Sequence, residues 1–231
     1  GFSGTQVLQV GQPLRSFYMY KAVGVYQTKE DLEKYPTMTS SKVGDVRYAD
    51  ITGDGKITEA DRTLVGNPSP KLTFGLTNRF NYKNFDLSIL LTGQTGGKIY
   101  GLWGRAIDRP GMGAQQNASG KWCNMWRSEE EPGDGKTPGI LSTTSSLYDT
   151  RWLYSSDFIK IKNITLGYNI PWKHKHIDFA RVFVSCENVH MWKSYDGYSP
   201  ESNNGGTDGD YDYGAYPQAR VFSLGINFTF K

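Results

Sequence analysis

Carboxylates with the spacing of calcium ligands stand in the twelve residues 50–61, which read DITGDGKITEAD. Calcium takes about six to eight oxygen ligands, and a calcium loop supplies them from alternate side chains, one backbone carbonyl and a final carboxylate, with glycine at the sharp turn. Gly55 stands at that turn. The sequence therefore predicts a structural calcium ion held by the side chains of Asp50, Thr52, Asp54, Thr58 and Asp61 and the carbonyl of Lys56.

Two substitutions depart from the usual pattern of such a loop. Thr52 replaces an acidic or amide residue, and Asp61 replaces the longer glutamate that binds calcium through both oxygens, so the predicted site is weaker than a calcium sensor. The alternative is a Gly-Asp-Gly turn whose carboxylates cap nearby backbone amides. A sensor is disfavoured, because VGNPSPK follows soon after Asp61 and leaves no room for an exiting helix.

A second group of residues has the chemistry of sugar binding. Tyrosine and tryptophan rings stack on the apolar face of a sugar, and carboxylates bond to its hydroxyl groups. The alternatives are a solvated acidic loop and packing against a partner protein. The residues of this weaker substrate-binding prediction are Trp103, Trp122, Trp126, Asp208, Asp210, Tyr211 and Tyr213.

Catalysis finds little support. The three histidines, His174, His176 and His190, have no serine, cysteine or carboxylate pair at a spacing that suggests a nucleophile or an acid and base. The run Glu129–Glu131 is typical of a solvated loop, and Cys123 and Cys186 lack neighbours at metal-binding spacing. The sequence predicts that the chain is not an enzyme.

Composition restricts the class of protein further. The 231 residues carry a net charge of +3 with both signs interleaved, so the chain has no basic patch for nucleic acid. No apolar run reaches the about 18 residues of a membrane helix, which leaves a membrane β-barrel open. The first residues, GFSGTQVLQVGQPL, show no signal peptide. The chain is therefore expected to be cytosolic or part of something larger.

The clearest element is a β-hairpin between residues 72 and 91. Apolar side chains alternate with polar ones from Leu72 to Tyr82, and the alternation resumes on the other parity from Phe85. A two-residue turn at positions 83–84 would place Tyr82 opposite Phe85, and both apolar rows would then lie on one face.

The same alternation predicts strands over 158–171, 178–188 and 220–231. Short turns alternate with irregular loops at 98–150 and 190–217, and this asymmetry is typical of an outer-membrane barrel. A soluble β-sandwich is the alternative. The strands have about the length that crosses a membrane. Aromatic residues stand near their ends, as an interfacial girdle requires: Tyr82, Phe85, Tyr168, Trp172, Phe179 and Phe230.

Five segments in order carry a family resemblance. They are QPLRSFYMYKAVGVYQTKEDL, GDVRYADITGDGKITEADRTLVGNPSPKLTFGLTNRFNYKNFDLSILLTG, WLYSSDFIKIKNITLGYNIP, RVFVSCENVHMWKSYDGYSPE and GAYPQARVFSLGINFTFK. This series resembles the C-terminal region of SusC/RagA-type TonB-linked outer-membrane transporters.

The resemblance implies an all-β fold, an antiparallel 22-stranded transmembrane barrel with an internal plug and long extracellular loops. It also implies the import of glycan oligomers or peptides, with a SusD-like surface lipoprotein and the TonB complex as partners. We expect residues 1–69 to be mostly extracellular and residues 70–231 to supply barrel strands and loops. The alternative from another class is a secreted, calcium-stabilised β-sandwich that binds glycans.

Overall fold

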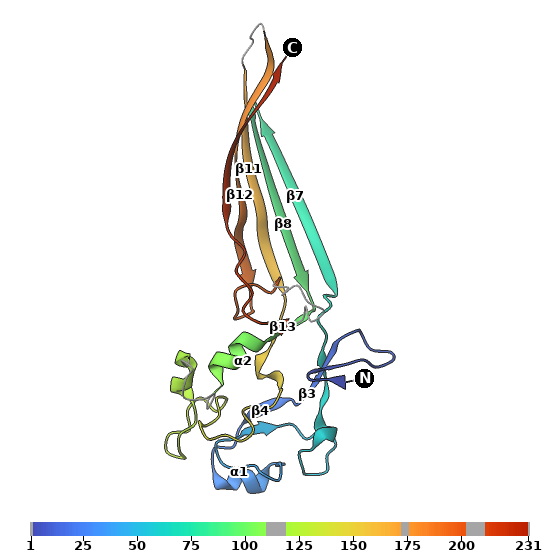
Figure 1. Cartoon of the computed structure of the whole chain (residues 1–231), viewed down its shortest axis with the longest axis vertical. Helices are drawn as coiled ribbons and strands as arrows, with labels where there is room; N and C mark the ends of the chain where they lie inside the picture. Colours follow the sequence, from blue (N-terminus) through green and yellow to red (C-terminus); the bar gives the residue numbers. More distant parts are fainter. Residues whose placement is uncertain (1, 110–118, 172–175, 202–210, 231) are drawn as a thin grey trace. The chain divides into compact units, whose positions relative to one another are not determined.

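The computed structural model describes residues 2–109, 119–171, 176–201 and 211–230. The chain forms two compact units, each assembled from separated stretches of sequence. Unit 1 comprises residues 1–69, 98–154 and 203–214, and unit 2 comprises 70–97, 155–202 and 215–231. No helix in the described part of the chain is long and apolar enough to cross a membrane. Figure 1 shows the elements of both units.

Unit 2 is one five-stranded antiparallel sheet. Its strands lie in the order β14-β12-β11-β8-β7. Their bounds are β7 Leu72–Tyr82, β8 Phe85–Thr95, β11 Phe158–Ile170, β12 Ile177–Lys193 and β14 Val221–Phe230. The predicted hairpin is confirmed, because Tyr82 pairs with Phe85, Phe80 with Leu87 and Leu76 with Leu91. Lys83 at the turn has a φ of 53°.

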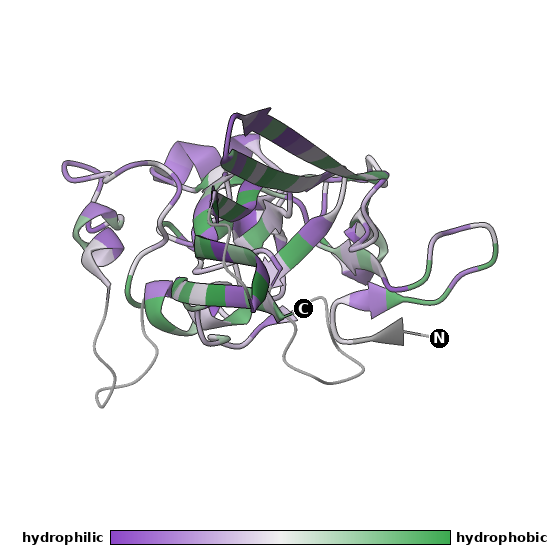
Figure 2. Ribbon diagram, turned by 90° about the horizontal axis from the view of Figure 1, so that it is seen from above, coloured by the Kyte–Doolittle hydropathy of each residue, from purple (hydrophilic) through white to green (hydrophobic). Residues whose placement is uncertain are grey.

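The sheet places its apolar side chains on one face. Leu76, Leu166, Val184 and Leu224 share this face, and each is 43% or more exposed. Figure 2 shows the resulting alternation of hydrophobic and hydrophilic bands along the strands. Among its described residues, unit 2 has no second sheet of its own to cover this row, as a β-sandwich would require.

The opposite face carries an ion pair across three strands. Arg181 on β12 donates from Nε to Asp86 Oδ1 at 3.0 Å and from Nη2 to Asp86 Oδ2 at 2.5 Å. Gly167 on β11 lies between them, and a Cβ there would stand 2.3 Å from Nη2 of Arg181 and 2.5 Å from Oδ1 of Asp86. The glycine therefore makes room for the ion pair.

A β-bulge lets one strand continue beyond its predicted end. The sequence predicts a strand over 178–188, but β12 continues to Lys193, and His190 pairs with Ile161 on β11. The register shifts between Ile161 and Asn163, and Asn188 on β12 has a φ of 53°. The bulge absorbs the change of apolar parity along β11 and lets the pairing continue. The strand end at Pro171 is confirmed, since β11 ends at Ile170.

The described residues of unit 1 form three small sheets. The strands β1 (Phe2–Ser3), β2 (Gln6–Val7), β3 (Ser16–Met19) and β6 (Thr63–Gly66) form the first. The pair β4 (Ala22–Val25) and β5 (Val46–Tyr48) forms the second. The third has the order β10 (Leu153–Ser155), β9 (Lys98–Gly101), β13 (Tyr211–Asp212), with β13 parallel to β9.

The helices of unit 1 are short. They are α1 (Lys29–Lys34), α2 (Leu102–Asp108) and the 3-10 turns η1 (Glu59–Asp61), η2 (Gly120–Asn124) and η3 (Thr150–Trp152). Thr28 and Asp31 form a capping box that begins α1. Residues 98–150 thus contain β9, α2, η2 and the start of η3, and the prediction of one irregular loop is wrong there, because tertiary contacts order segments whose sequence has no clear period.

Two aromatic clusters form the core of unit 1. Phe17, Met19, Tyr100 and Trp152 make the first. The second consists of Tyr20, Val46, Tyr48 and Ile57. Unit 1 is therefore built as a protein in water is built, with its large side chains inside.

Candidate functional site

The loop at 50–61 turns its carboxylates onto its own backbone. Asp50 Oδ1 accepts from the amide of Gly53 at 2.6 Å and Oδ2 accepts from Gly55 at 2.9 Å. Asp54 Oδ1 accepts from the amide of Lys56 at 2.9 Å. The loop continues into η1 and then β6, so the absence of an exiting helix is confirmed.

Asp61 is the most heavily bonded carboxylate of this loop, and it is fully buried. Its Oδ1 accepts from the amides of Ile51 and Thr52 at 3.0 and 3.1 Å, and Oδ2 accepts from the amide of Thr58 at 2.7 Å. Burial alone raises the pKa of Asp61, but these N–H groups outweigh it and lower the pKa to about 2. Asp61 ties the start of the loop to its end.

These bonds are the backbone capping of the alternative interpretation. Among the described residues, no three histidine, cysteine, aspartate or glutamate side chains gather closely enough to hold a metal ion. A carboxylate oxygen has two lone pairs, however, so it can accept an amide N–H group and bind calcium at the same time. Calcium binding by Asp50, Thr52, Asp54, Lys56, Thr58 and Asp61 stays a prediction for titration to decide.

The three tryptophans predicted to bind substrate have different environments. Trp126 packs against two glycines, Gly44 and Gly139, and its Nε1 donates to the carbonyl of Gln27 at 3.1 Å. A Cβ on Gly44 would stand 2.5 Å from its ring, and one on Gly139 would stand 3.0 Å away. Trp122 Nε1 donates to the carbonyl of Ile107 at 3.1 Å. Trp122 and Trp126 thus hold segments together, whereas Trp103 is half exposed.

In the acidic, tyrosine-rich stretch, one tyrosine is likewise packed in the core and another is exposed. Tyr211 packs in the core beside Phe17 and Tyr100. Tyr213 is 58% exposed, and the residue after it, Gly214, lies against the indole of Trp103.

Unit 1 therefore brings two exposed aromatic side chains, Trp103 and Tyr213, to the same region from distant parts of the sequence. Both keep the exposure that sugar stacking needs. Several residues named in the sequence predictions lie outside the described residues: Asp208, Asp210, Trp172 and His174.

A cavity of about 380 Å³ in unit 1 was not predicted from the sequence. Five separated segments line it, including Gly24 on β4, Asp108 at the end of α2, Lys121 on η2, Lys136 and Arg151. Ligand cavities usually occupy about 300–1,000 Å³. No local pattern could have revealed this cavity, because its walls meet only in the folded unit.

A buried polar network holds one wall of this cavity. Asp149 is fully buried and accepts from Arg151 Nε at 2.9 and 3.0 Å and from the hydroxyl of Tyr48 at 2.9 Å. Burial, followed by the charge of Asp149, raises the pKa of Tyr48. A second buried carboxylate, Asp45, accepts from the amide and hydroxyl of Thr143 at 2.8 and 2.9 Å. The β4–β5 pair thereby anchors residues 143–151.

Comparison with known proteins identifies the relatives of this chain. No family model matches it. It is 31% identical to TonB-dependent receptor P3 of Formosa agariphila, over 98% of this chain and 23% of that protein. It is 27% identical to TonB-dependent receptor SusC of Bacteroides thetaiotaomicron, over 97% of this chain and 20% of that protein. The chain thus spans about a quarter or less of these relatives.

A solved structure of the RagAB peptide importer in its open-open state has a similar fold. The TM-score is 0.78 at 22% identity, over 98% of this chain and 23% of that one. The relatives define the class of protein as TonB-dependent receptors of the outer membrane, and the solved structure shares the fold of the chain. The chain is a segment of a SusC/RagA-type TonB-linked outer-membrane transporter.

Proposed function

We propose that the chain supplies five neighbouring strands and an outer loop layer to a closed 22-stranded barrel. The barrel imports oligosaccharides or peptides with energy delivered through TonB. The observation that carries this proposal is the exposed apolar row of unit 2, which includes Leu76, Leu166 and Leu224. Such a row costs free energy in water and is stabilised by lipid.

The two ends of the sheet differ in their connections, and this difference supports an orientation of the strands across the membrane. One end closes with the two-residue turn between β7 and β8. From the other end the chain leaves on long connections, from β8 to β11 and from β12 to β14. Outer-membrane barrels have short periplasmic turns and long extracellular loops. We therefore assign the long connections, and with them unit 1, to the extracellular side.

A SusD-like surface lipoprotein is the proposed partner on that side. The supporting observations are the likeness to SusC and to the RagAB importer. Catalysis has no part in the proposal, because the named relatives are receptors and importers.

The full-length transporter tests this function. In cells that carry it, we expect uptake of a fluorescent oligosaccharide or oligopeptide to require both the transporter and TonB. The folded protein should migrate faster than the heated one on a gel, as closed barrels do. Uptake that persists without TonB, or a protein that is soluble without detergent, would contradict the proposal.

A further inference from the structure

A lysine is buried on the polar face of unit 2. Asp86 and Thr92 share this face, because side chains alternate along β8. Lys160 on β11 pairs with Thr92, so its side chain rises from the polar face as well. Lys160 is 2% exposed, whereas its neighbour Ile159 on the apolar face is 50% exposed. The polar face is therefore covered at this end of the sheet, and the apolar face is not.

The connection from β12 to β14 lies over this lysine. Lys160 Nζ donates to Glu201 Oε2 at 2.7 Å and to the side-chain oxygen of Gln218. Glu201 follows the end of β12 and Gln218 precedes the start of β14, so one ammonium group joins both arms of the connection. A buried lysine is tolerated only when its charge is paired and its N–H groups are bonded. We call the described residues of this connection, 194–201 and 215–220, the strap.

Two further side chains of β12 hold the ends of the strap. Lys193, the last residue of the strand, donates from Nζ to the carbonyls of Tyr195 and Gly197 at 2.7 and 2.5 Å. At the other end, Asn188 Nδ2 donates to the carbonyl of Ala219 at 2.8 Å. Asn188 lies in the β-bulge and has a φ of 53°. Bulges redirect side chains, and this one gives Asn188 the direction that reaches the strap.

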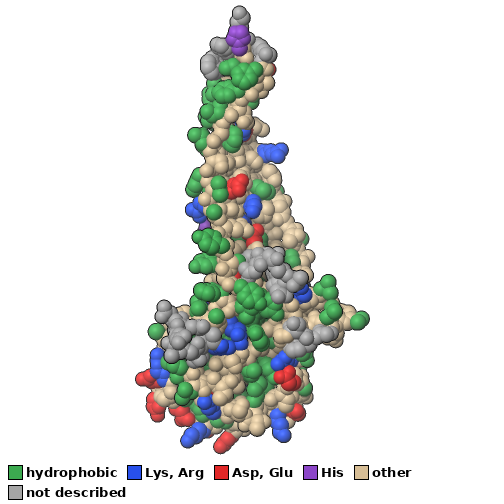
Figure 3. All heavy atoms as spheres, viewed as in Figure 1, with side chains coloured by type: hydrophobic (Ala, Val, Ile, Leu, Met, Phe, Trp, Pro, Cys, Tyr) green, Lys and Arg blue, Asp and Glu red, His purple; other side chains and the backbone are tan. Residues whose placement is uncertain are grey.

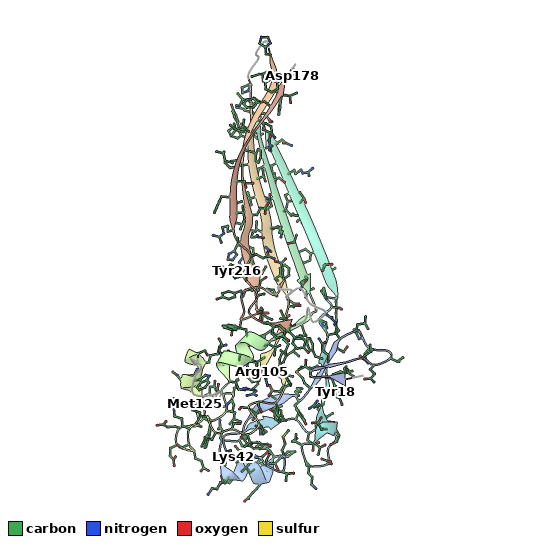
Figure 4. The ribbon with its side chains drawn as sticks, in the orientation of Figure 1. Tyr18, Lys42, Arg105, Met125, Asp178 and Tyr216 are labelled. Carbon is green, nitrogen blue, oxygen red and sulfur yellow. The ribbon has the colours of Figure 1, made fainter. Side chains whose placement is uncertain are left out.

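The connection is longer than the joining of two neighbouring strands requires. A two-residue turn joins β7 to β8, which are neighbours in the sheet as β12 and β14 are. The connection from β12 to β14 instead uses residues 194–220 and returns onto the sheet. Parts of the strap remain accessible, since Tyr198 and Tyr216 are 65% and 96% exposed. Figure 4 shows Tyr216 at the end of the sheet opposite to Asp178, the end with the long connections.

We propose that the strap narrows the lumen of the transporter on its extracellular side, and that the ion pair of Lys160 with Glu201 holds it there. In a closed barrel the polar face of unit 2 is the wall of the lumen, because the apolar face contacts lipid. A segment fixed on that wall reduces the width of the passage and limits the size of the cargo. Lys160 is thus a positioning residue for size selectivity. This inference rests on the proposed function for the closed barrel and its cargo.

Thiol labelling of the full-length transporter in detergent measures how well the strap covers the wall. All native cysteines, Cys123 and Cys186 included, are replaced by serine, and Thr92→Cys places a thiol beside Lys160. We expect a bulky polyethylene glycol maleimide to label this thiol slowly. Lys160→Met should speed that labelling about tenfold or more, because Glu201 loses the cation that holds the strap. Rapid labelling of the parent protein would overturn the proposal.

Three further variants, each compared in its folded, heat-modifiable form, locate the effect. Lys162→Met removes the same charge from the same strand and should leave labelling unchanged. Glu201→Ala breaks the pair from the strap side, without altering the sheet, and should act like Lys160→Met. The exchange of Lys160→Glu with Glu201→Lys should restore slow labelling, because the pair forms again. Unchanged labelling in Lys160→Met or Glu201→Ala, equal acceleration by Lys162→Met, or no restoration by the exchange would each overturn the proposal.

Uptake measured on the same variants separates this inference from the proposed function. The probe is the fluorescent oligosaccharide or oligopeptide of the uptake test, in graded lengths, and Lys160→Met should admit longer members while uptake of short ones stays the same. TonB-dependent uptake with a length limit that Lys160→Met leaves unchanged keeps the importer and contradicts the strap. Labelling that Lys160→Met accelerates, in a protein without TonB-dependent uptake, supports the strap and contradicts the importer.

Discussion

The two units distribute their side chains in opposite ways. In the described part of the chain, the largest fully buried side chains all lie in unit 1, among them Phe17, Tyr26, Tyr100 and the carboxylates of Asp45 and Asp149. Unit 2 instead exposes a row of leucine, isoleucine and phenylalanine side chains. Figure 3 shows hydrophobic side chains along the sheet and charged ones of both signs around unit 1.

The proposed barrel explains this difference by two solvents. Water favours a buried apolar core and satisfied buried carboxylates, as in unit 1. Lipid favours an apolar outer surface with every strand paired, as the proposed barrel gives to unit 2. A substitution that is harmless in one unit should therefore be costly in the other, and this contrast can be measured in the full-length protein.

The largest effect is expected from a charge on the apolar face of the sheet. Leu224→Arg should destabilise the folded barrel by about 2–4 kcal/mol, because arginine near the middle of a bilayer loses its hydration. Ser223→Arg, the next residue on the opposite face of β14, is the matched control and should cost much less. Urea titration in lipid vesicles measures both. Equal destabilisation by the two substitutions would contradict the proposal that the apolar face of unit 2 contacts lipid.

The next effect concerns two tryptophans of unit 1. Trp126→Ala should destabilise unit 1 by about 2–3 kcal/mol, because it leaves a cavity between Gly44 and Gly139. Trp103→Ala should change stability by less than about 0.5 kcal/mol, because the indole is half exposed. Limited proteolysis of the outer loops measures the difference. If Trp103→Ala lowers uptake while stability holds, its predicted contact with substrate gains support.

Asp61→Asn should cost about 2 kcal/mol, because the buried charge accepts several backbone N–H groups and an amide cannot replace both oxygens. Hydrogen exchange at the amides of Ile51, Thr52 and Thr58 measures the loss. The cost should be the same with and without millimolar calcium. A cost that appears only with calcium would show that the loop is a metal site.

The same carboxylate gives a pH dependence. The pKa of Asp61 is about 2 in the folded protein, whereas an aspartate without these contacts, as in the unfolded chain, has a pKa of 3.8. Because folding lowers the pKa, the stabilisation is complete above pH 3.8 and is lost as the pH falls toward 2. The protection factor of the Thr58 amide, which corrects for the intrinsic exchange rate at each pH, should fall over that interval, and Asp61→Asn should abolish the dependence.

The smallest effect is expected at Gly167, the glycine on β11 that makes room for the ion pair of Arg181 and Asp86. Gly167→Ala should cost about 1 kcal/mol, because its Cβ displaces the ion pair of Arg181 and Asp86, which is partly exposed. Gly75→Ala on β7 is the control, since its Cβ would approach nothing closer than 3.8 Å. Urea titration should resolve the two. A larger cost at Gly75 would contradict the assigned role of Gly167.

The sequence by itself determined the strands of unit 2 and the face each residue occupies. Alternation of period two and the turn at Lys83 are local signals, and they suffice to set the register of β7 on β8. The register shift between Ile161 and Asn163 and the continuation of β12 to Lys193 were not predicted, because a bulge depends on how neighbouring strands pair.

Only the tertiary structure decided what the polar residues of unit 1 do. The calcium-like spacing of Asp50, Asp54 and Asp61 did not show that these carboxylates accept backbone amides within their own loop, which the structure shows. The cavity of unit 1 joins Lys121, Lys136 and Arg151 across distant segments. Spacing along a chain fixes local geometry, whereas contacts between distant segments depend on the packing of the whole unit.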